Sequence, residues 1–289
     1  MSYECHGHII LSGRDFTNAI RQHQSGVLTA VIDSRLAQYA RAGVTFFRDG
    51  GDNMGACVYA KRAAPAYGID YRTPCFAIHK AGCYGKALGR AFSDPGEFRA
   101  LVDEAADAGA DFIKLMVTGI MDFHTYGVLT PGALTMEELV FCVDYCHGLG
   151  LRVMAHCNGA EHIKNALASG CDSLEHGYYI DEEGIRLLAE TGAVWVPTVT
   201  PVANLLGNST FSDAILERIV RGHYDALHRA HDLGCLVACG SDAGAVGVAH
   251  GQGAFDERDC FIEALGSARA ADAVIARGNA FVQETFRRA

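Results

Sequence analysis

The chain has 289 residues, 49% of them hydrophobic, and a formal net charge of −10 at pH 7. This length suits one large domain with a substantial core. The acidic balance argues against a nucleic-acid binder, which needs a basic face to meet phosphates. The chain has no apolar run of the roughly 18 residues that a membrane span needs. Its N-terminus also has no basic segment before a long apolar stretch, so we expect neither membrane association nor a secretory signal.

The eleven cysteines are scattered along the chain without a CxxC pair. Disulfides are rare in the cytosol, so this pattern indicates reduced thiols in a cytoplasmic protein. Most of these cysteines lie in apolar runs, where a thiol packs as a small core residue. The examples are Cys75, Cys142, Cys171, Cys235 and Cys239.

Short segments rich in β-branched and aromatic residues alternate with helical patterns along the chain. The predicted strands, in chain order, are 3–9, 44–49, 73–79, 111–118, 152–156, 172–176, 194–198 and 236–241. The predicted helices between them are 30–42, 54–67, 94–108, 135–149, 159–169, 181–191 and 212–233, with further helical segments near 256–264, 268–277 and 279–287.

Several helices carry start and stop signals. Thr135 with Glu138 forms a capping-box pattern, and Ser93 or Asp94 before Pro95 suits another helix start. A glycine at the position typical of a helix C-terminus is followed shortly by a strand in six places. These glycines are Gly43, Gly109, Gly150, Gly170, Gly192 and Gly234.

The repeat of helix, glycine and strand predicts parallel strands joined by crossover helices. Eight strands favour an α/β fold of the (β/α)8 TIM barrel type over an open doubly wound sheet. No GxGxxG follows the first strand, which weakens the dinucleotide-binding alternative. We therefore expect residues 1–289 to form a single barrel domain, with extra helices at about 256–289.

In such barrels the catalytic groups lie at the C-terminal ends of the strands. The first strand contains His6 and His8, whose side chains should face one side while Cys5 and Gly7 face the other. Lys114 lies inside the apolar fourth strand, where burying an ammonium is unfavourable. A snorkelling or carboxylate-paired lysine explains it, and so does a neutral amine that reacts with carbon dioxide to give a metal-bridging carbamate.

The fifth and sixth predicted strands end at His156 and His176, and Asp242 follows the eighth. Each alone has an ordinary explanation, as a hydrogen-bonded structural histidine or a turn aspartate. Together with the two histidines of the first strand and the lysine of the fourth, they predict a metal site at one end of the barrel. Such nitrogen and oxygen ligands suit zinc, with manganese, iron, cobalt or nickel as alternatives.

Seven stretches of the sequence follow one another in the order typical of a known family. They are HGH at 6–8, GVTFFRDG at 43–50, FIKLMVTG at 112–119, HCNGAE at 156–161, SLEHG at 173–177, VPTV at 196–199 and GSDAG at 240–244. By these stretches the chain resembles the amidohydrolase superfamily. The chain is most similar to the bacterial Xaa-Pro and other aminoacyl dipeptidases (prolidases) and to imidazolonepropionase-like proteins. Superfamily members usually carry a flanking β-sandwich built from both chain ends. We expect the given sequence to lack this β-sandwich, either naturally or because the sequence was trimmed.

The resemblance implies two divalent metal ions, zinc by preference. The implied ligands are His6, His8 and Asp242 for one ion, His156 and His176 for the other, and an N6-carboxylated Lys114 bridging both. The implied nucleophile is a hydroxide that bridges the ions. Asp242 is the implied catalytic residue, which takes the hydroxide's proton and passes it to the leaving amine.

The loops after the third, fourth and eighth strands hold candidates for substrate contact, although ordinary surface roles explain them equally well. These candidates are His79, Tyr84, His124, Tyr126 and His250. We interpret Asp49 as a support of the site rather than a ligand. Three further histidines on the 212–233 helix are interpreted as solvated surface residues, namely His223, His228 and His231.

The leading hypothesis is a hydrolase that cleaves an amide or peptide bond in a small-molecule substrate, such as a dipeptide, an N-acyl amino acid or a cyclic amide. One alternative is a mononuclear deaminase, although deaminases of this superfamily generally lack the bridging lysine that Lys114 supplies. A lactonase or esterase would use the same site chemistry. A ligand-binding barrel without activity is the non-enzymatic alternative. The resemblance also suggests a homodimer or larger assembly.

Overall fold

The computed structural model describes residues 3–288 and contains two groups of parallel strands. The first group pairs in the order β1 (Tyr3–Gly7), β2 (Phe46–Asp49) and β3 (Asp70–Arg72). The second pairs in the order β10 (Leu236–Val237), β9 (Val194–Val196), β8 (Ser173–His176), β7 (Val153–Cys157), β6 (Ile113–Met116), β4 (Ala77–Lys80) and β5 (Gly89–Phe92).

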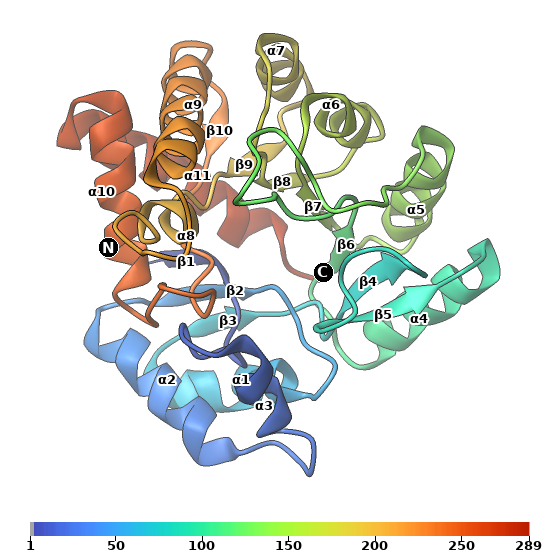
Figure 1. Ribbon diagram of the computed structural model, residues 1–289. Helices are drawn as coiled ribbons and strands as arrows, with labels where there is room; N and C mark the ends of the chain where they lie inside the picture. Colours follow the sequence, from blue (N-terminus) through green and yellow to red (C-terminus); the bar gives the residue numbers. More distant parts are fainter. Residues whose placement is uncertain (1–2, 289) are drawn as a thin grey trace.

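The two groups belong to one (β/α)8 TIM barrel, which confirms the predicted fold class. Backbone hydrogen bonds join β1 to the segment after β10. The Cys5 N–H donates to the Cys239 carbonyl over 3.0 Å, and the Asp242 N–H donates to the His6 carbonyl over 2.7 Å. The other junction between the two groups lies between β3 and β4, which are consecutive in the chain. There β3 pairs with β2 of the first group, and β4 pairs with β6 of the second. Figure 1 shows the helices arranged around these strands.

The third strand differs from the prediction of a single strand at 73–79, because residues 73–76 are not in a strand: β3 ends just before them and β4 begins just after. Pro74 has no N–H to donate to a neighbouring strand. Cys75 next to it has a φ of 66°, in the left-handed region that strands do not adopt. The short elements β5, α1 (Phe16–Arg21) and α8 (Thr200–Ala203) were not predicted.

The outer helices lie where the periodic pattern predicts them. They are α2 (Thr29–Arg41), α3 (Ala56–Ala63) with the 3-10 turn η1 (Ala64–Tyr67), α4 (Pro95–Asp107), α5 (Met136–Gly148), α6 (Ala160–Ala168), α7 (Glu182–Thr191) and α9 (Asp213–Asp232). The predicted capping box of Thr135 and Glu138 begins α5, and Asp94 caps α4. The six predicted C-terminal glycines all have positive φ values.

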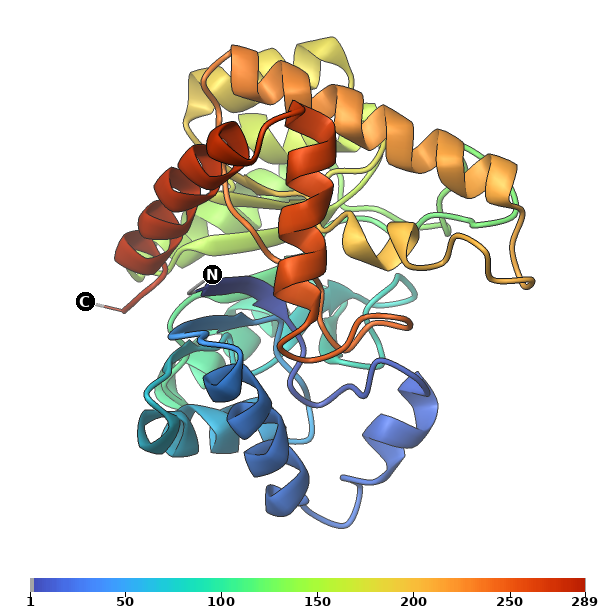
Figure 2. The ribbon, with the colours of Figure 1, turned by 90° about the vertical axis from the view of Figure 1, so that its left-hand side faces the viewer.

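The C-terminal part of the chain forms two helices rather than the three predicted, α10 (Gly253–Leu265) and α11 (Ala268–Thr285). Figures 1 and 2 place α11 on the side of the strands opposite α1 and α8. Val282 and Phe286 at its end are fully buried in a cluster with Cys5, Phe46 and Phe112. The end of α11 therefore forms an apolar floor to the barrel.

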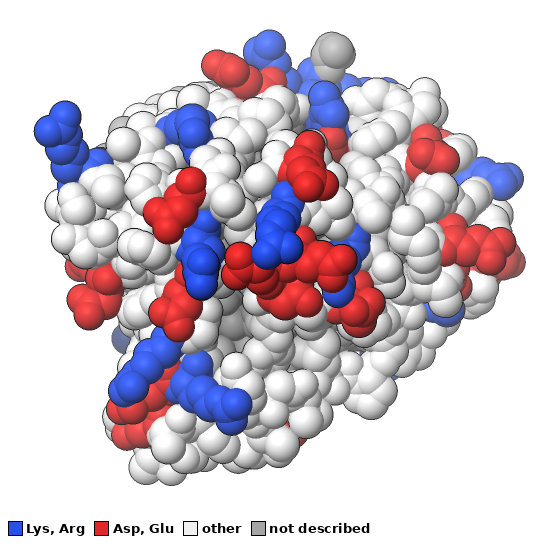
Figure 3. Space-filling view, turned by 90° about the horizontal axis from the view of Figure 1, so that it is seen from above, with Lys and Arg blue, Asp and Glu red and all other residues white. Residues whose placement is uncertain are grey.

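Charged side chains on the outer helices are interspersed in sign. Figure 3 shows acidic and basic residues side by side over the face that includes α6, α7 and α9. Lys164 on α6 contacts both Glu161 and Glu183, for example, at 2.8 and 2.9 Å. Within residues 3–288, no helix combines the length and apolar character needed to cross a membrane.

The floor of the barrel generates a prediction about stability. Replacing Phe286 with alanine should lower the free energy of unfolding by about 3–5 kcal/mol, because it opens a cavity under the barrel. Urea unfolding followed by circular dichroism measures this change. The neighbouring, exposed Arg287 gives a matched control, since Arg287→Ala should change stability by less than about 0.5 kcal/mol. Equal effects of the two substitutions on stability would contradict the role of Phe286 in the apolar floor.

Candidate metal centre

Strand alternation directs Lys114 and His156 into the barrel. Ile113 and Leu115, on either side of Lys114, pack outwards into the core between the sheet and the helices. Lys114 therefore points inwards and is almost completely buried. On β7, His156 lies two residues after Met154, a member of the cluster inside the barrel.

An irregularity in β1 changes the expected orientation of its side chains. The pairing of β1 with β2 slips by one residue between Glu4 and Gly7, as in a β-bulge. Cys5 packs inside the barrel, although strict alternation predicts it on the face opposite His6. Because β1 has one more residue than β2 between these two pairs, Cys5 and His6 both face inwards. The prediction that Cys5 faces away from His6 was therefore wrong.

Left-handed backbone at two strand ends turns further donors towards the cavity. His176 has a φ of 66° directly after the inward-facing Glu175, and Asp242 has a φ of 56°. Thr198, which contacts His176, has a φ of 48°. For residues other than glycine such conformations typically cost about 1–3 kcal/mol, and they cluster at functional sites.

Three donors converge at the β1 side of this centre. One ligand atom each from His6, His8 and Asp242 lies within 4.8 Å of the other two. The Asp242 Oδ1 atom is 3.4 Å from His8 Nε2 and 3.8 Å from His6 Nε2. Lys114 Nζ lies 3.5 Å from His6 Nε2.

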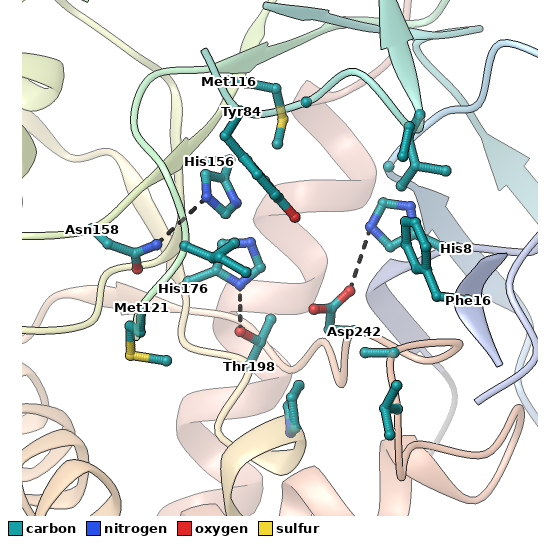
Figure 4. A pocket seen from close by; sticks show the side chains of 18 of the residues that line it. His8, Phe16, Tyr84, Met116, Met121, His156, Asn158, His176, Thr198 and Asp242 are labelled. Atoms are coloured by element: carbon teal, nitrogen blue, oxygen red, sulfur yellow. Dashed lines mark hydrogen bonds and ion pairs between the residues drawn. The ribbon is translucent and has the colours of Figure 1, made fainter. Parts of the chain in front are cut away.

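The other two histidines complete the group. The ring centroids of His156 and His176 are 4.5 Å apart, and those of His6 and His176 are 4.8 Å apart. Figure 4 shows His156 and His176 on one side of the pocket and His8 on the other, with Asp242 between them. All six residues predicted as metal ligands are therefore brought into one cluster.

Burial controls the protonation of these groups. Desolvation, helped by the charge of Lys114, lowers the pKa of His8 and that of His156 to about 3. It also lowers the pKa of His6 and that of His176 well below their usual value. All four imidazoles are therefore neutral at pH 7, the state in which histidine binds a metal.

The pKa values of Lys114 and Asp242 are also shifted in directions that suit a metal centre. Burial lowers the pKa of Lys114 to about 8, so a usable fraction of the amine is neutral near pH 7 and can form a carbamate. Burial raises the pKa of Asp242 to about 7, because its charge has no full compensation. A bound cation would compensate it, so the residues present fit the implied metal ions.

A buried ion pair orients the first histidine, and its role was not predicted. His6 Nδ1 contacts Glu175 Oε2 at 2.5 Å, and Arg48 donates to the other carboxylate oxygen over 2.8 Å. Arg48 also donates to the Cys5 carbonyl, and its guanidinium lies 4.5 Å from the Phe286 ring centroid. The sequence did contain a signal for Arg48, because it is a charged residue inside a predicted strand, as Lys114 is.

Other contacts hold the remaining ligands in place. Thr198 Oγ1 lies 2.7 Å from His176 Nδ1. At residue 50 only glycine fits, because a Cβ atom there would lie 2.1 Å from Cε1 of His8. Asp49 accepts hydrogen bonds from the Ile9 and Gly51 N–H groups, in keeping with the supporting role expected of it.

A cavity of about 590 Å³ opens above these donors. Its lining includes His8, Lys114, His156, His176 and Asp242 together with many apolar side chains. It lies at the C-terminal ends of the strands, where barrels of this type place their active sites.

Of the five candidates for substrate contact, Tyr84 lines the cavity, and its ring lies tilted against that of His156 with the centroids 5.2 Å apart. His79 is buried beside the Lys80 carbonyl, and His250 has both ring nitrogens within hydrogen-bond distance of other groups. His124 packs on Phe211, and Tyr126 lies under Arg218. These four residues do not belong to the cavity lining.

One histidine was assigned to the wrong environment. His223 on α9 is buried, stacks on the Tyr178 ring and lies 3.0 Å from the Pro197 carbonyl. The prediction of a solvated residue was therefore wrong, because α9 turns this position towards the barrel. His228 and His231 on the same helix are exposed, as predicted.

The barrel and its ring of donors define a TIM-barrel protein with a metal-capable centre. The model of the amidohydrolase family matches residues 5–274, so the chain belongs to the amidohydrolase family.

Among curated proteins, an uncharacterised protein of Mycobacterium tuberculosis is 28% identical over 166 residues, which cover 55% of this chain and 44% of that protein. Ochratoxinase of Aspergillus niger is 31% identical over 155 residues, which cover 50% of this chain and 31% of the ochratoxinase. The matches thus span less than half the length of either relative.

Solved structures share the fold over nearly the whole chain. A crystal structure of a Xaa-Pro dipeptidase superposes with a TM-score of 0.77 at 20% identity, covering 98% of this chain and 75% of that one. The A. niger ochratoxinase structure gives a TM-score of 0.76 at 24% identity, covering 96% and 70%. At these identities the likeness establishes the barrel fold.

The buried ion pair gives a prediction for metal binding. Glu175→Gln should weaken zinc binding by about 10- to 100-fold, because the amide no longer compensates Arg48 and orients His6 less strongly. Competition with a chromophoric zinc chelator measures the dissociation constant. Glu161→Gln, at an exposed carboxylate on α6, is the control and should leave zinc affinity unchanged. Unchanged affinity in both variants would contradict the role given to Glu175.

Proposed function

We propose that this protein is a metal-dependent hydrolase that cleaves an amide or peptide bond in a small molecule. The observation that carries the proposal is one cluster of four neutral imidazoles, a buried lysine and a carboxylate, of which all but His6 line a single cavity. The proposed substrates are dipeptides, N-acyl amino acids or cyclic amides. Family membership supports the chemistry in general terms.

Two divalent cations, zinc by preference, are part of this proposal. His6, His8 and Asp242 would hold one, and His156 and His176 the other, with N6-carboxylated Lys114 shared between them. When bound, such ions lower the pKa of a water molecule and polarise a carbonyl group. The central position of Lys114, 3.5 Å from His6 Nε2, supports its bridging role.

Asp242 is the proposed catalytic residue. Its carboxylate faces the cavity, and its raised pKa of about 7 lets it both accept and release a proton near neutral pH. In the proposed reaction it takes a proton from the attacking water and gives it to the leaving nitrogen. This transfer is needed because an amide anion is a poor leaving group.

Tyr84 is the proposed donor to the substrate. Figure 4 shows its hydroxyl pointing into the pocket, towards the space above Asp242. Burial raises the pKa of Tyr84 to about 12, so the hydroxyl keeps its proton at neutral pH. It can therefore donate a hydrogen bond to the carbonyl oxygen as negative charge develops there.

Lys114 distinguishes this proposal from a mononuclear deaminase. Wild-type protein prepared with zinc and bicarbonate should contain about two metal ions per chain by elemental analysis, and Lys114→Ala should contain fewer. Labelling with ¹³C-bicarbonate should give a carbamate carbon signal in the wild type alone. About one ion per chain in both proteins would instead favour the mononuclear alternative.

Hydrolysis itself is tested with the zinc-loaded protein on a panel of dipeptides, N-acyl amino acids, cyclic amides, esters and lactones. We expect amide cleavage that disappears on chelation and returns with zinc. Asp242→Asn should lower kcat at least about 100-fold, because the amide cannot shuttle the proton. Activity confined to esters and lactones would support the esterase alternative. No hydrolysis and no metal would favour a ligand-binding barrel.

A further inference from the structure

We propose that Glu257, on α10, is a positioning residue of the metal centre. It holds the segment that carries Thr198, and Thr198 in turn fixes the imidazole of His176 for the second cation. This inference rests on the two-cation centre proposed above. It gives a role in that centre to a carboxylate that does not belong to the cavity lining.

The contact between Thr198 and His176 is the first step. Thr198 Oγ1 lies 2.7 Å from His176 Nδ1, the contact drawn in Figure 4, and both side chains are buried. A neutral imidazole carries one hydrogen, on either ring nitrogen. When Nδ1 donates this hydrogen to the hydroxyl oxygen, the lone pair of Nε2 is left free for a cation. The hydroxyl therefore selects the tautomer as well as the orientation of the ring.

Thr198 itself is held in an unfavourable conformation. Its φ of 48° lies in the left-handed region, which β-branched residues rarely adopt. The Tyr178 hydroxyl donates to the Thr198 carbonyl over 2.7 Å and supports this residue from one side. Such a conformation persists only where the surrounding structure holds it firmly. The segment after β9 therefore needs a further support, and Glu257 supplies it.

Glu257 binds the two residues that directly follow Thr198. Its Oε1 atom accepts from the Val199 N–H over 3.0 Å. Its Oε2 atom accepts from the Thr200 N–H over 2.8 Å and from the Thr200 hydroxyl over 2.6 Å. Three donors on two oxygens fix both the position and the plane of the carboxylate. The backbone that leaves Thr198 is therefore held on a rigid support from α10.

The burial of Glu257 argues against a role as a simple helix cap. The side chain is completely buried, and burial raises its pKa to about 7 in spite of its hydrogen bonds. Placing a carboxylate there is therefore unfavourable. The caps of α4 and α5 are instead exposed side chains directly before each helix, Asp94 and Thr135. Since α8 has only four residues, we infer that the carboxylate serves the residue before it.

The tautomer of His176 gives a test that needs no bound metal. Glu257→Gln keeps the shape of the side chain but has one acceptor oxygen, so at least one backbone N–H is left unpaired. Nitrogen-15 NMR of the metal-free full chain should show His176 of the wild type with its hydrogen on Nδ1. Glu257→Gln and Thr198→Val should each show a mixture of tautomers, whereas Thr198→Ser, which keeps the hydroxyl, should resemble the wild type.

Zinc affinity gives a second readout. In competition with a chromophoric chelator, Glu257→Gln should bind the second ion about 10- to 100-fold more weakly and the first ion less than about three-fold more weakly. Thr198→Val should have a similar effect. The double variant should bind the second ion within about three-fold of the weaker single variant, because both substitutions remove the same constraint.

Asp52 offers a matched control. It is a buried carboxylate that accepts from the N–H groups of Met54, Ala56 and Cys57 at the start of α3, after β2 rather than after β9. Asp52→Asn should leave the tautomer of His176 and the affinity for the second ion unchanged. Circular dichroism checks that each variant is folded.

A milder substitution covers the case in which Glu257→Gln does not fold. Thr200→Val removes only the hydroxyl donor to Glu257. Because the two backbone N–H groups still hold the carboxylate, this variant should bind the second ion only about three-fold more weakly.

The outcomes separate this inference from the proposed function. A folded Glu257→Gln with the wild-type tautomer and affinity for the second ion would overturn the inference, as would an unchanged affinity in Thr200→Val if the glutamine variant does not fold. Equal weakening in Asp52→Asn, or additive effects in the double variant, would also overturn it. Two bound ions without cleavage of any amide would overturn the proposed function alone. A wild type that binds no zinc would overturn both.

Discussion

The Arg48–Glu175 ion pair lies at the centre of the barrel, and both side chains are fully buried. A buried charge is unfavourable unless every polar atom around it is satisfied. Arg48 meets this condition by contacts to the Cys5 carbonyl and the Ser173 hydroxyl, and Glu175 meets it through His6. One interaction thus ties β1, β2 and β8 together and orients a donor of the proposed metal centre.

The interior is layered along the barrel axis around this pair. Below it, the end of α11 supplies an apolar floor that excludes water from the guanidinium. Above it, the six candidate metal ligands lie in a region where burial keeps the imidazoles neutral. Electrostatic interactions are stronger in such surroundings than in water, so the same burial that destabilises uncompensated charges makes the site receptive to cations.

Chemistry and specificity are carried by different parts of the chain. The donors lie at or directly after strands, whose hydrogen bonds hold them rigidly, and the left-handed conformations of His176 and Asp242 are supported by the packed barrel. The walls of the cavity come mainly from the loop between β4 and β5, the loop after β6, and α8, with smaller contributions from α1 and the segment before α9. Such loops can change without disturbing the donors, which is how one barrel accommodates many substrates.

The sequence by itself determined the alternation of most strands with the outer helices and the caps of α4 and α5, because apolar periodicity and capping act over a few neighbouring residues. Short motifs at the strand ends also predicted the six candidate ligands that the structure brings together. Only the tertiary structure decided the bulge in β1, the break at Pro74 and the burial of His223. It also decided the Arg48–Glu175 pair, whose members are 127 residues apart. These features depend on which distant segments come into contact, and such contacts leave no local periodic signal.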